Sequence, residues 1–262
     1  MTDQYSSLDL LVERQVKSGI EKVSFSTNQL IIYSILAGLY ISIGAAASAV
    51  IYTLTVDINA GSAKILSALV FCIGIILVVI GGASLFTGNI LLVMPFVAGK
   101  VKLSEIIKNW LIVWFFNFIG AVLFSLLVSR SDIFFDQVSS YLVHLAEQKA
   151  SLDFYTAFLR GVGCNILVCL SIWIASASDT TTSKILSASI PVSIFVILGF
   201  EHCVANMFYF PTALLSGANI SFAAMLSNLI PVTLGNIVGG AIIGLAYFYS
   251  ANYARVSKYR SA

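Results

Sequence analysis

The chain consists of long apolar runs separated by short polar segments. A helix needs about 20 apolar residues to cross the hydrocarbon of a bilayer. The pattern predicts six crossings within charge-free runs over 23–56, 65–99, 109–129, 161–178, 185–200 and 203–254, the last divided by a polar break at "SGANIS". The polar segments predict loops near 53–64, 100–108, 130–153, 179–184 and 216–227.

Two of the predicted crossings contain an interruption. Residues 65–99 would form a helix of about 50 Å, whereas the hydrocarbon core is about 30 Å thick. The interruption is expected at "GGASLFTGN", residues 81–89, and the second lies at "GFEHCVAN", residues 199–206. Broken helices are tolerated at membrane depth only where protein or a water-filled cavity satisfies the freed backbone groups. The breaks therefore predict a cavity or a packed junction at each site.

The crossing that follows each break has the same pattern of residues. "NWLIVWFFNFIGAVLF" and "NLIPVTLGNIVGGAII" share the spacing N-x7-N-x2-G, which aligns Asn117 and Gly120 with Asn236 and Gly239. The halves 28–129 and 154–250 are thus predicted to be repeats, and three crossings per half make the second inverted. Paired interrupted helices in inverted repeats indicate a permeation site. For Asn117 and Asn236, interhelical hydrogen bonding is the simpler interpretation.

Composition places the chain in a membrane. It is 59% hydrophobic and only 10% charged, with a mean hydropathy of +0.97, which excludes an ordinary soluble domain. In the six-crossing topology, ten basic residues lie on the side of the termini and four on or near the other. The ten are Arg14, Lys17, Lys22, Lys100, Lys102, Lys108, Lys184, Arg255, Lys258 and Arg260; the four are Lys64, Arg130, Lys149 and Arg160. This bias predicts that both termini are cytoplasmic.

Residues 1–262 are therefore predicted to form a single transmembrane channel domain. Residues 1–27 show no cleavable signal and are expected to stay as a cytoplasmic N-terminal segment containing a short surface helix. The low charge and the absence of a targeting peptide favour the cytoplasmic membrane of a prokaryote. The partners expected are membrane lipid and a small-molecule substrate, with no nucleic acid.

Glu201 and His202 lie side by side in an apolar stretch from Ile185 to Leu215. Ionisable groups within a membrane are costly and usually functional. His144 is the one other histidine of the sequence and is interpreted as a surface residue. With two histidines in the sequence and no second carboxylate near His202, the chain lacks the paired groups that an intramembrane enzyme would need. The four cysteines lie in apolar runs without ligand spacing, so buried thiols are expected and neither a metal nor a cofactor.

Three segments carry a resemblance to a known family. "LFTGN" at 85–89, "RGVGCNILVCLSIW" at 160–173 and "GFEHCVANMF" at 199–208 resemble the signature stretches of the formate/nitrite transporter family, in the same order and spacing over essentially the whole chain. The resemblance implies an all-α, aquaporin-like protomer of six transmembrane helices assembled as a homo-pentamer. It also implies passage of small monovalent anions such as formate, nitrite or hydrosulfide, which some members couple to protons.

The resemblance also implies roles for individual residues. His202 matches the central pore histidine, Thr87 the threonine that faces it, and Lys149 the vestibule lysine that pairs with Asn165. Phe71 and Phe195 match the outer apolar constriction, Leu85 and Val168 match the inner one, and Ile75 falls where relatives often carry leucine. One departure is Ser84, where many relatives carry a glutamate.

Chemistry supports these roles independently. A bare anion crossing an apolar constriction loses several kcal/mol of solvation, on the order of magnitude found for buried ions. For the anion of a weak acid, desolvation favours the protonated form, and His202 is suited to supply a proton or a hydrogen bond; the sequence leaves both routes open. Lys149 would attract anions to the outer mouth.

The remaining polar residues of the breaks are expected to anchor the loops. Glu201 is predicted to do so through backbone amides, together with Asn89 and Asn206. An aquaporin-like channel for neutral solutes is the alternative function. It would be expected to show Asn-Pro-Ala at each break, whereas Asn89 is followed by Ile-Leu and Asn206 by Met-Phe.

Overall fold

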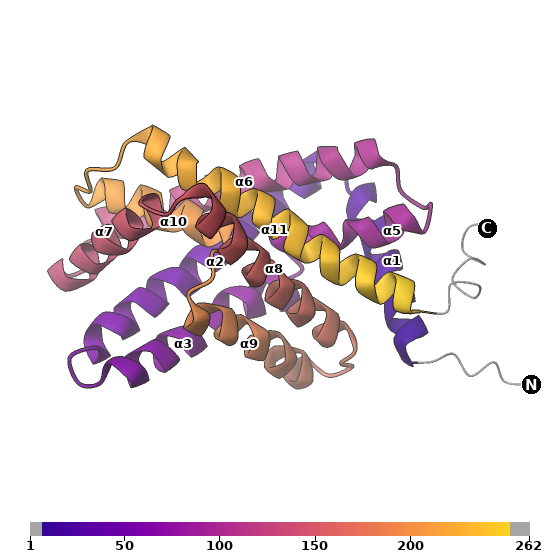
Figure 1. Cartoon of the computed structure of the whole chain (residues 1–262), viewed down its shortest axis with the longest axis horizontal. Helices are drawn as coiled ribbons and strands as arrows, with labels where there is room; N and C mark the ends of the chain where they lie inside the picture. The colour runs from indigo at the N-terminus through magenta and orange to yellow at the C-terminus, as the bar shows by residue number, and fades with distance from the viewer. Residues whose placement is uncertain (1–6, 252–262) are drawn as a thin grey trace, which may run out of the picture.

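The computed structural model describes residues 7–251, and the regular elements in that range are all helices (Figure 1). They are α1 Ser7–Ser24, α2 Thr27–Thr55, α3 Ala60–Gly81, α4 Phe86–Asn89, the 3-10 turn η1 Ile90–Leu92, α5 Val93–Val97, α6 Leu103–Arg130, α7 Asp136–Ala150, α8 Phe154–Ser176, α9 Thr181–Leu198, α10 Cys203–Leu215 and α11 Phe222–Ser250. Within this range, six helices are long and apolar enough to cross a membrane: α2, α3, α6, α8, α9 and α11. The prediction of six crossings is confirmed.

Each predicted break begins at a glycine in the left-handed backbone region. Gly82 ends α3 with φ 73°, and Gly199 ends α9 with φ 71°. L side chains rarely adopt this conformation, whereas glycine adopts it without steric cost. The helix resumes at Phe86 and at Cys203, so the non-helical stretches are 82–85 and 199–202. The breaks lie within the predicted segments and are shorter than them.

The two halves of the chain pack in the same way. In the first, α2 contacts α3 and α6; in the second, α8 contacts α9 and α11. A Cβ added at Gly120 would lie 2.1 Å from the carbonyl oxygen of Ile35, and one at Gly239 would lie 2.2 Å from that of Val162. The glycines of the repeated motif therefore allow equivalent backbone-to-backbone contact between the outer helices of each half.

Two helices outside the repeat differ from what the sequence predicted. Residues 130–153 were predicted to be a loop but contain the 15-residue helix α7. Its buried residues Val138, Leu142 and Ala146 recur every four positions, a helical spacing obscured by the polar residues between them. In Figure 1, α7 and α1 lie at opposite ends of the molecule.

The N-terminal helix α1 is more than a surface helix. Val12 is fully buried and Val16 nearly so, in a cluster with Met94 and Trp173. Apolar side chains spaced by four residues explain the packing of this face against the first broken segment. Residues 1–6 of the N-terminal segment, and Arg255, Lys258 and Arg260 of the topology argument, lie outside the described residues.

Candidate functional site: a polar contact beside an aromatic constriction

The two broken segments meet through the side chains of Thr87 and His202. Thr87 Oγ1 lies 3.0 Å from His202 Nε2, and both residues are buried. Thr87 belongs to the short α4, and His202 is the N-cap residue of α10. The predicted pair is therefore brought into contact at the junction of the two halves.

The cap fixes which nitrogen of His202 donates. The backbone N–H of Ala205 donates to His202 Nδ1 at 3.1 Å. In a neutral imidazole one nitrogen accepts and the other carries the proton, so Nε2–H is the donor to Thr87 Oγ1. The hydroxyl proton of Thr87 then stays available to another acceptor. The pair can offer a hydrogen bond to an anion without the imidazole first being charged.

An aromatic pair lies directly next to His202. The Phe71 and Phe195 rings are 5.6 Å apart, edge to face, and the Phe195 ring lies 5.8 Å from that of His202. Both phenylalanines are at most 4% exposed and line a cavity of about 510 Å³. His202 also lines this cavity, so the aromatic pair and the imidazole lie side by side at its wall, next to Thr87.

That cavity, hereafter the outer vestibule, opens on the α7 side. Besides the two phenylalanines it is lined by Lys64, Lys149, Arg160, Glu201 and His144, among others. His144 is exposed and lies 2.8 Å from the Gln148 amide nitrogen, in agreement with its interpretation as a surface residue. Three cations and one carboxylate give the vestibule a net positive lining, which favours anions.

The residues assigned to the remaining constriction lie in the apolar core. Ile75, Leu85 and Val168 are each at most 2% exposed and share one cluster with Phe71 and Phe195. All four cysteines are buried free thiols, as predicted.

The predicted pairing of Lys149 with Asn165 is wrong. Lys149 Nζ donates to Glu201 Oε1 at 2.7 Å, whereas Asn165 Nδ2 donates to the carbonyl oxygens of Asn236 at 2.6 Å and Thr87 at 3.2 Å. Asn165 is fully buried in α8 and uses its amide on neighbouring backbone. Lys149, in the last turn of α7, instead reaches the second break.

The prediction that Glu201 binds backbone amides is also wrong. Its carboxylate accepts from Lys149 and from Asn206 Nδ2 at 2.6 Å, not from backbone amides. The backbone at the break is held by Asn236, whose Oδ1 accepts from Cys203 N at 2.9 Å and whose Nδ2 donates to Glu201 O at 3.0 Å. One asparagine amide can satisfy both an N–H and a carbonyl, which a carboxylate cannot.

Asn117 does the same at the first break. Its Oδ1 accepts from Phe86 N at 2.9 Å, and its Nδ2 donates to Ser84 O at 3.0 Å and Ser34 O at 2.7 Å. The interhelical hydrogen bonds expected of Asn117 and Asn236 are present, and they serve to hold the broken loops.

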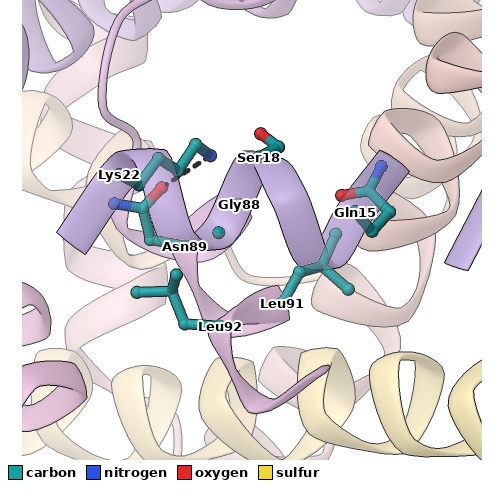
Figure 2. Close-up of a pocket in the computed structure, with 8 residues that line it drawn as sticks. Gln15, Ser18, Lys22, Gly88, Asn89, Leu91 and Leu92 are labelled. Atoms are coloured by element: carbon teal, nitrogen blue, oxygen red, sulfur yellow. Dashed lines mark hydrogen bonds between the residues drawn. The ribbon is translucent and has the colours of Figure 1, made fainter. Parts of the chain in front are cut away.

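Lys22, for which the sequence predicted no role at the site, lies at the first break. Lys22 Nζ donates to Asn89 Oδ1 at 2.9 Å, as Figure 2 shows, and Asn89 Nδ2 donates to Asn109 Oδ1 at 3.0 Å. Lys22 belongs to α1, which the sequence indicated only as a surface helix. The signal that could have found this group is Asn109, the first residue of the repeated motif.

Comparisons with known proteins agree with this architecture. The family model described as "Formate/nitrite transporter" matches residues 9–250. The chain is 37% identical over 242 residues to a "Probable formate transporter" of Methanothermobacter thermautotrophicus, covering 85% of this chain and 88% of that protein.

Two solved structures share the fold. An "FNT family ion channel" superposes with a TM-score of 0.85 at 28% identity, over 92% of this chain and 98% of the other. A "Pentameric formate channel with formate bound" superposes with a TM-score of 0.79 at 33% identity, over 86% and 96%. With its inverted repeats, its two broken helices and a match over nearly its whole length, the chain belongs to the formate/nitrite transporter family.

Proposed function

We propose that the protein is a channel for small monovalent anions of weak acids, with formate as the first candidate and nitrite and hydrosulfide as further ones. It would act as a homo-pentamer in a cytoplasmic membrane, with both termini cytoplasmic. The main support is the Thr87–His202 contact beside the Phe71–Phe195 pair. The named relatives, a formate transporter and a formate channel, support the substrate class.

The mechanism follows from the order of groups along the path. Cations of the outer vestibule concentrate anions in front of the aromatic pair, which excludes hydrated ions. Next to the pair, the Thr87 hydroxyl, which accepts from His202 Nε2–H, donates to the anion's oxygen in place of water. Desolvation there favours the protonated acid. The anion therefore crosses either hydrogen-bonded to the pair or as the neutral acid, in which case His202 first takes up a proton from solvent and then passes it to the anion, returning to the neutral imidazole.

Formate uptake into liposomes containing the purified protein tests the function. Uptake above that of empty liposomes is expected; a formate current in planar bilayers accompanies it if formate crosses as the anion, and no current does if it crosses as the neutral acid. A channel for neutral solutes would instead pass glycerol without formate uptake, and that result would overturn the proposal.

The Thr87–His202 contact is tested by Thr87→Val. Losing one donor to the anion should lower formate flux about tenfold, the effect of about 1.4 kcal/mol on a barrier. Thr212→Val is the matched control, since Thr212 is an equally buried threonine that donates to Ser125. Equal fluxes of the two variants would contradict the role of Thr87.

His202→Asn distinguishes passage of the hydrogen-bonded anion from passage of the neutral acid, since only proton transfer requires the imidazole. The measurement is formate flux from pH 5 to 8, around the unperturbed pKa of histidine at about 6.5.

A further inference from the structure

Each break carries a hydrogen-bonded group of one lysine and two asparagines. The outer group, on the α7 side, is Lys149, Asn206 and Asn228; the inner group, on the α1 side, is Lys22, Asn89 and Asn109. In the outer group, Asn206 donates to Asn228 at 2.8 Å and Asn228 Nδ2 to Lys149 O at 2.9 Å. In the inner group, Asn89 donates to Asn109 at 3.0 Å and Asn109 Nδ2 to Lys22 O at 3.4 Å. The two groups are counterparts in the inverted repeat.

The groups differ at one position. Glu201 lies five residues before Asn206, and Ser84 lies five residues before Asn89. Both residues have their carbonyl oxygen bound at 3.0 Å by the asparagine of the repeated motif, Asn236 or Asn117. Ser84 therefore occupies the place of Glu201, and the inner group has no carboxylate at the position where the outer group has one.

The missing carboxylate changes the partner of the lysine. Lys149 is paired with Glu201, whereas Lys22 binds the neutral carbonyl of Asn89 and forms no ion pair within residues 7–251. Burial lowers the pKa of Lys22 to about 8, and the nearby Cys169 opposes this shift only partly. An ammonium carries three N–H donors, of which Asn89 takes one. A half-buried cation with free donors is thus left at the first break.

The surroundings of Lys22 suit a small anion. A pocket of about 10 Å³ opens beside it and is lined by the polar side chains of Gln15, Ser18 and Asn89 (Figure 2). That volume holds about one water molecule, so one oxygen atom of a small anion has room to reach Lys22 Nζ while the rest of the anion stays outside the pocket. The outer vestibule differs, because its cations Lys64 and Arg160, which form no ion pair with any described residue, are exposed and screened by solvent.

We propose that Lys22 is an entry site for a small monovalent anion on the α1 face and that Ser84 keeps this site free, so that the two mouths of the channel bind the anion through different groups. The inference rests on the proposed anion channel. At the α7 face the anion meets exposed cations beside a neutralised lysine. At the α1 face it meets Lys22, and the anion itself acts as the counterion of this lysine.

The test is Ser84→Glu. A glutamate there can accept from the second N–H of the Asn89 amide and from Lys22, reproducing the outer arrangement. The half-saturating formate concentration for entry from the α1 face should rise about tenfold, the loss of one charge-assisted hydrogen bond. The value for entry from the α7 face should not change. Ser84→Ala, which adds no charge, is the matched control and should behave as the unchanged protein.

Entry from each face is measured in right-side-out and inverted membrane vesicles. A protease-cleavable tag fused before Met1 reports which face carries α1. Since a buried glutamate can impair assembly, Lys22→Gln serves as a second variant and should raise the same half-saturation value on the same face. Recovery of each variant as a monodisperse oligomer controls for folding.

The outcomes separate this inference from the proposed function. Absence of formate flux through the unchanged protein would overturn both. Normal flux with Ser84→Glu and Lys22→Gln unchanged, or altered equally at both faces, would leave the anion channel intact and overturn the entry site.

Discussion

At the residue scale, the ion pair between Lys149 and Glu201 places two opposite charges in the interior of the protein. The lysine and glutamate side chains are only 11% and 4% exposed, and their charged atoms lie 2.7 Å apart. A buried pair is roughly balanced as a whole, because the Coulombic gain offsets the desolvation of both ions. Removal of one partner leaves the other charge buried and uncompensated.

We therefore predict that Lys149→Met destabilises the protein by about 3–5 kcal/mol. At roughly 2–4 °C per kcal/mol for a chain of this size, the thermal midpoint of the detergent-purified protein should fall by about 10 °C. The double variant Lys149→Met with Glu201→Gln removes both charges and should regain most of the loss. An equally unstable double variant would show that the lysine acts by packing alone.

At the element scale, the fold depends on helices that approach each other through their backbones. Gly38 on α2 and Gly120 on α6 face carbonyl oxygens of the opposite helix, and a Cβ at either would lie within 2.1 Å of one. Helix association in membranes relies on such close packing of small residues. The same contact fixes Asn117, which lies one turn before Gly120 and holds the first break.

Gly120→Ala should consequently separate α2 from α6 and disturb the first break, because the obstructing atom is backbone and cannot move aside. We expect markedly lower recovery of monodisperse protein by size-exclusion chromatography and a reduced thermal midpoint. Gly81→Ala is the matched control, since its Cβ would meet only the Tyr40 ring at an ordinary 3.4 Å. Similar recovery of both variants would refute the steric explanation.

At the scale of the whole molecule, the proposed path lies within one chain. Phe71 contacts Phe195, Phe195 contacts His202, and His202 contacts Thr87, all within the same chain. An oligomer of such chains would hold one path in each subunit, around its symmetry axis.

Mixed oligomers test this arrangement. Ala205→Trp should block the path, since Ala205 is buried beside His202 and lines the outer vestibule. Co-expression with the unchanged chain should lower formate flux in proportion to the fraction of blocked subunits. A much steeper fall, in which one blocked subunit silences the oligomer, would contradict independent paths.

Much of the architecture could be read from local patterns. Charge-free runs indicated the six crossings because lipid tolerates few charges, and Gly82 and Gly199 marked breaks that only glycine forms without strain. The match of Asn117 to Asn236 revealed the repeat. The helix α7 was missed because its three buried residues are dispersed among polar ones.

What the sequence by itself determined is the set of properties encoded by neighbouring residues: the solvent of each segment and the positions of the breaks. The pairing of Thr87 with His202 came from the resemblance to the family. Only the tertiary structure decided which side chains pair, namely Lys149 with Glu201 in place of Asn165, and Lys22 with Asn89. The physical reason is that these partners lie 52 and 67 residues apart. Their contact depends on how α7 and α1 dock onto the breaks, which no local pattern specifies.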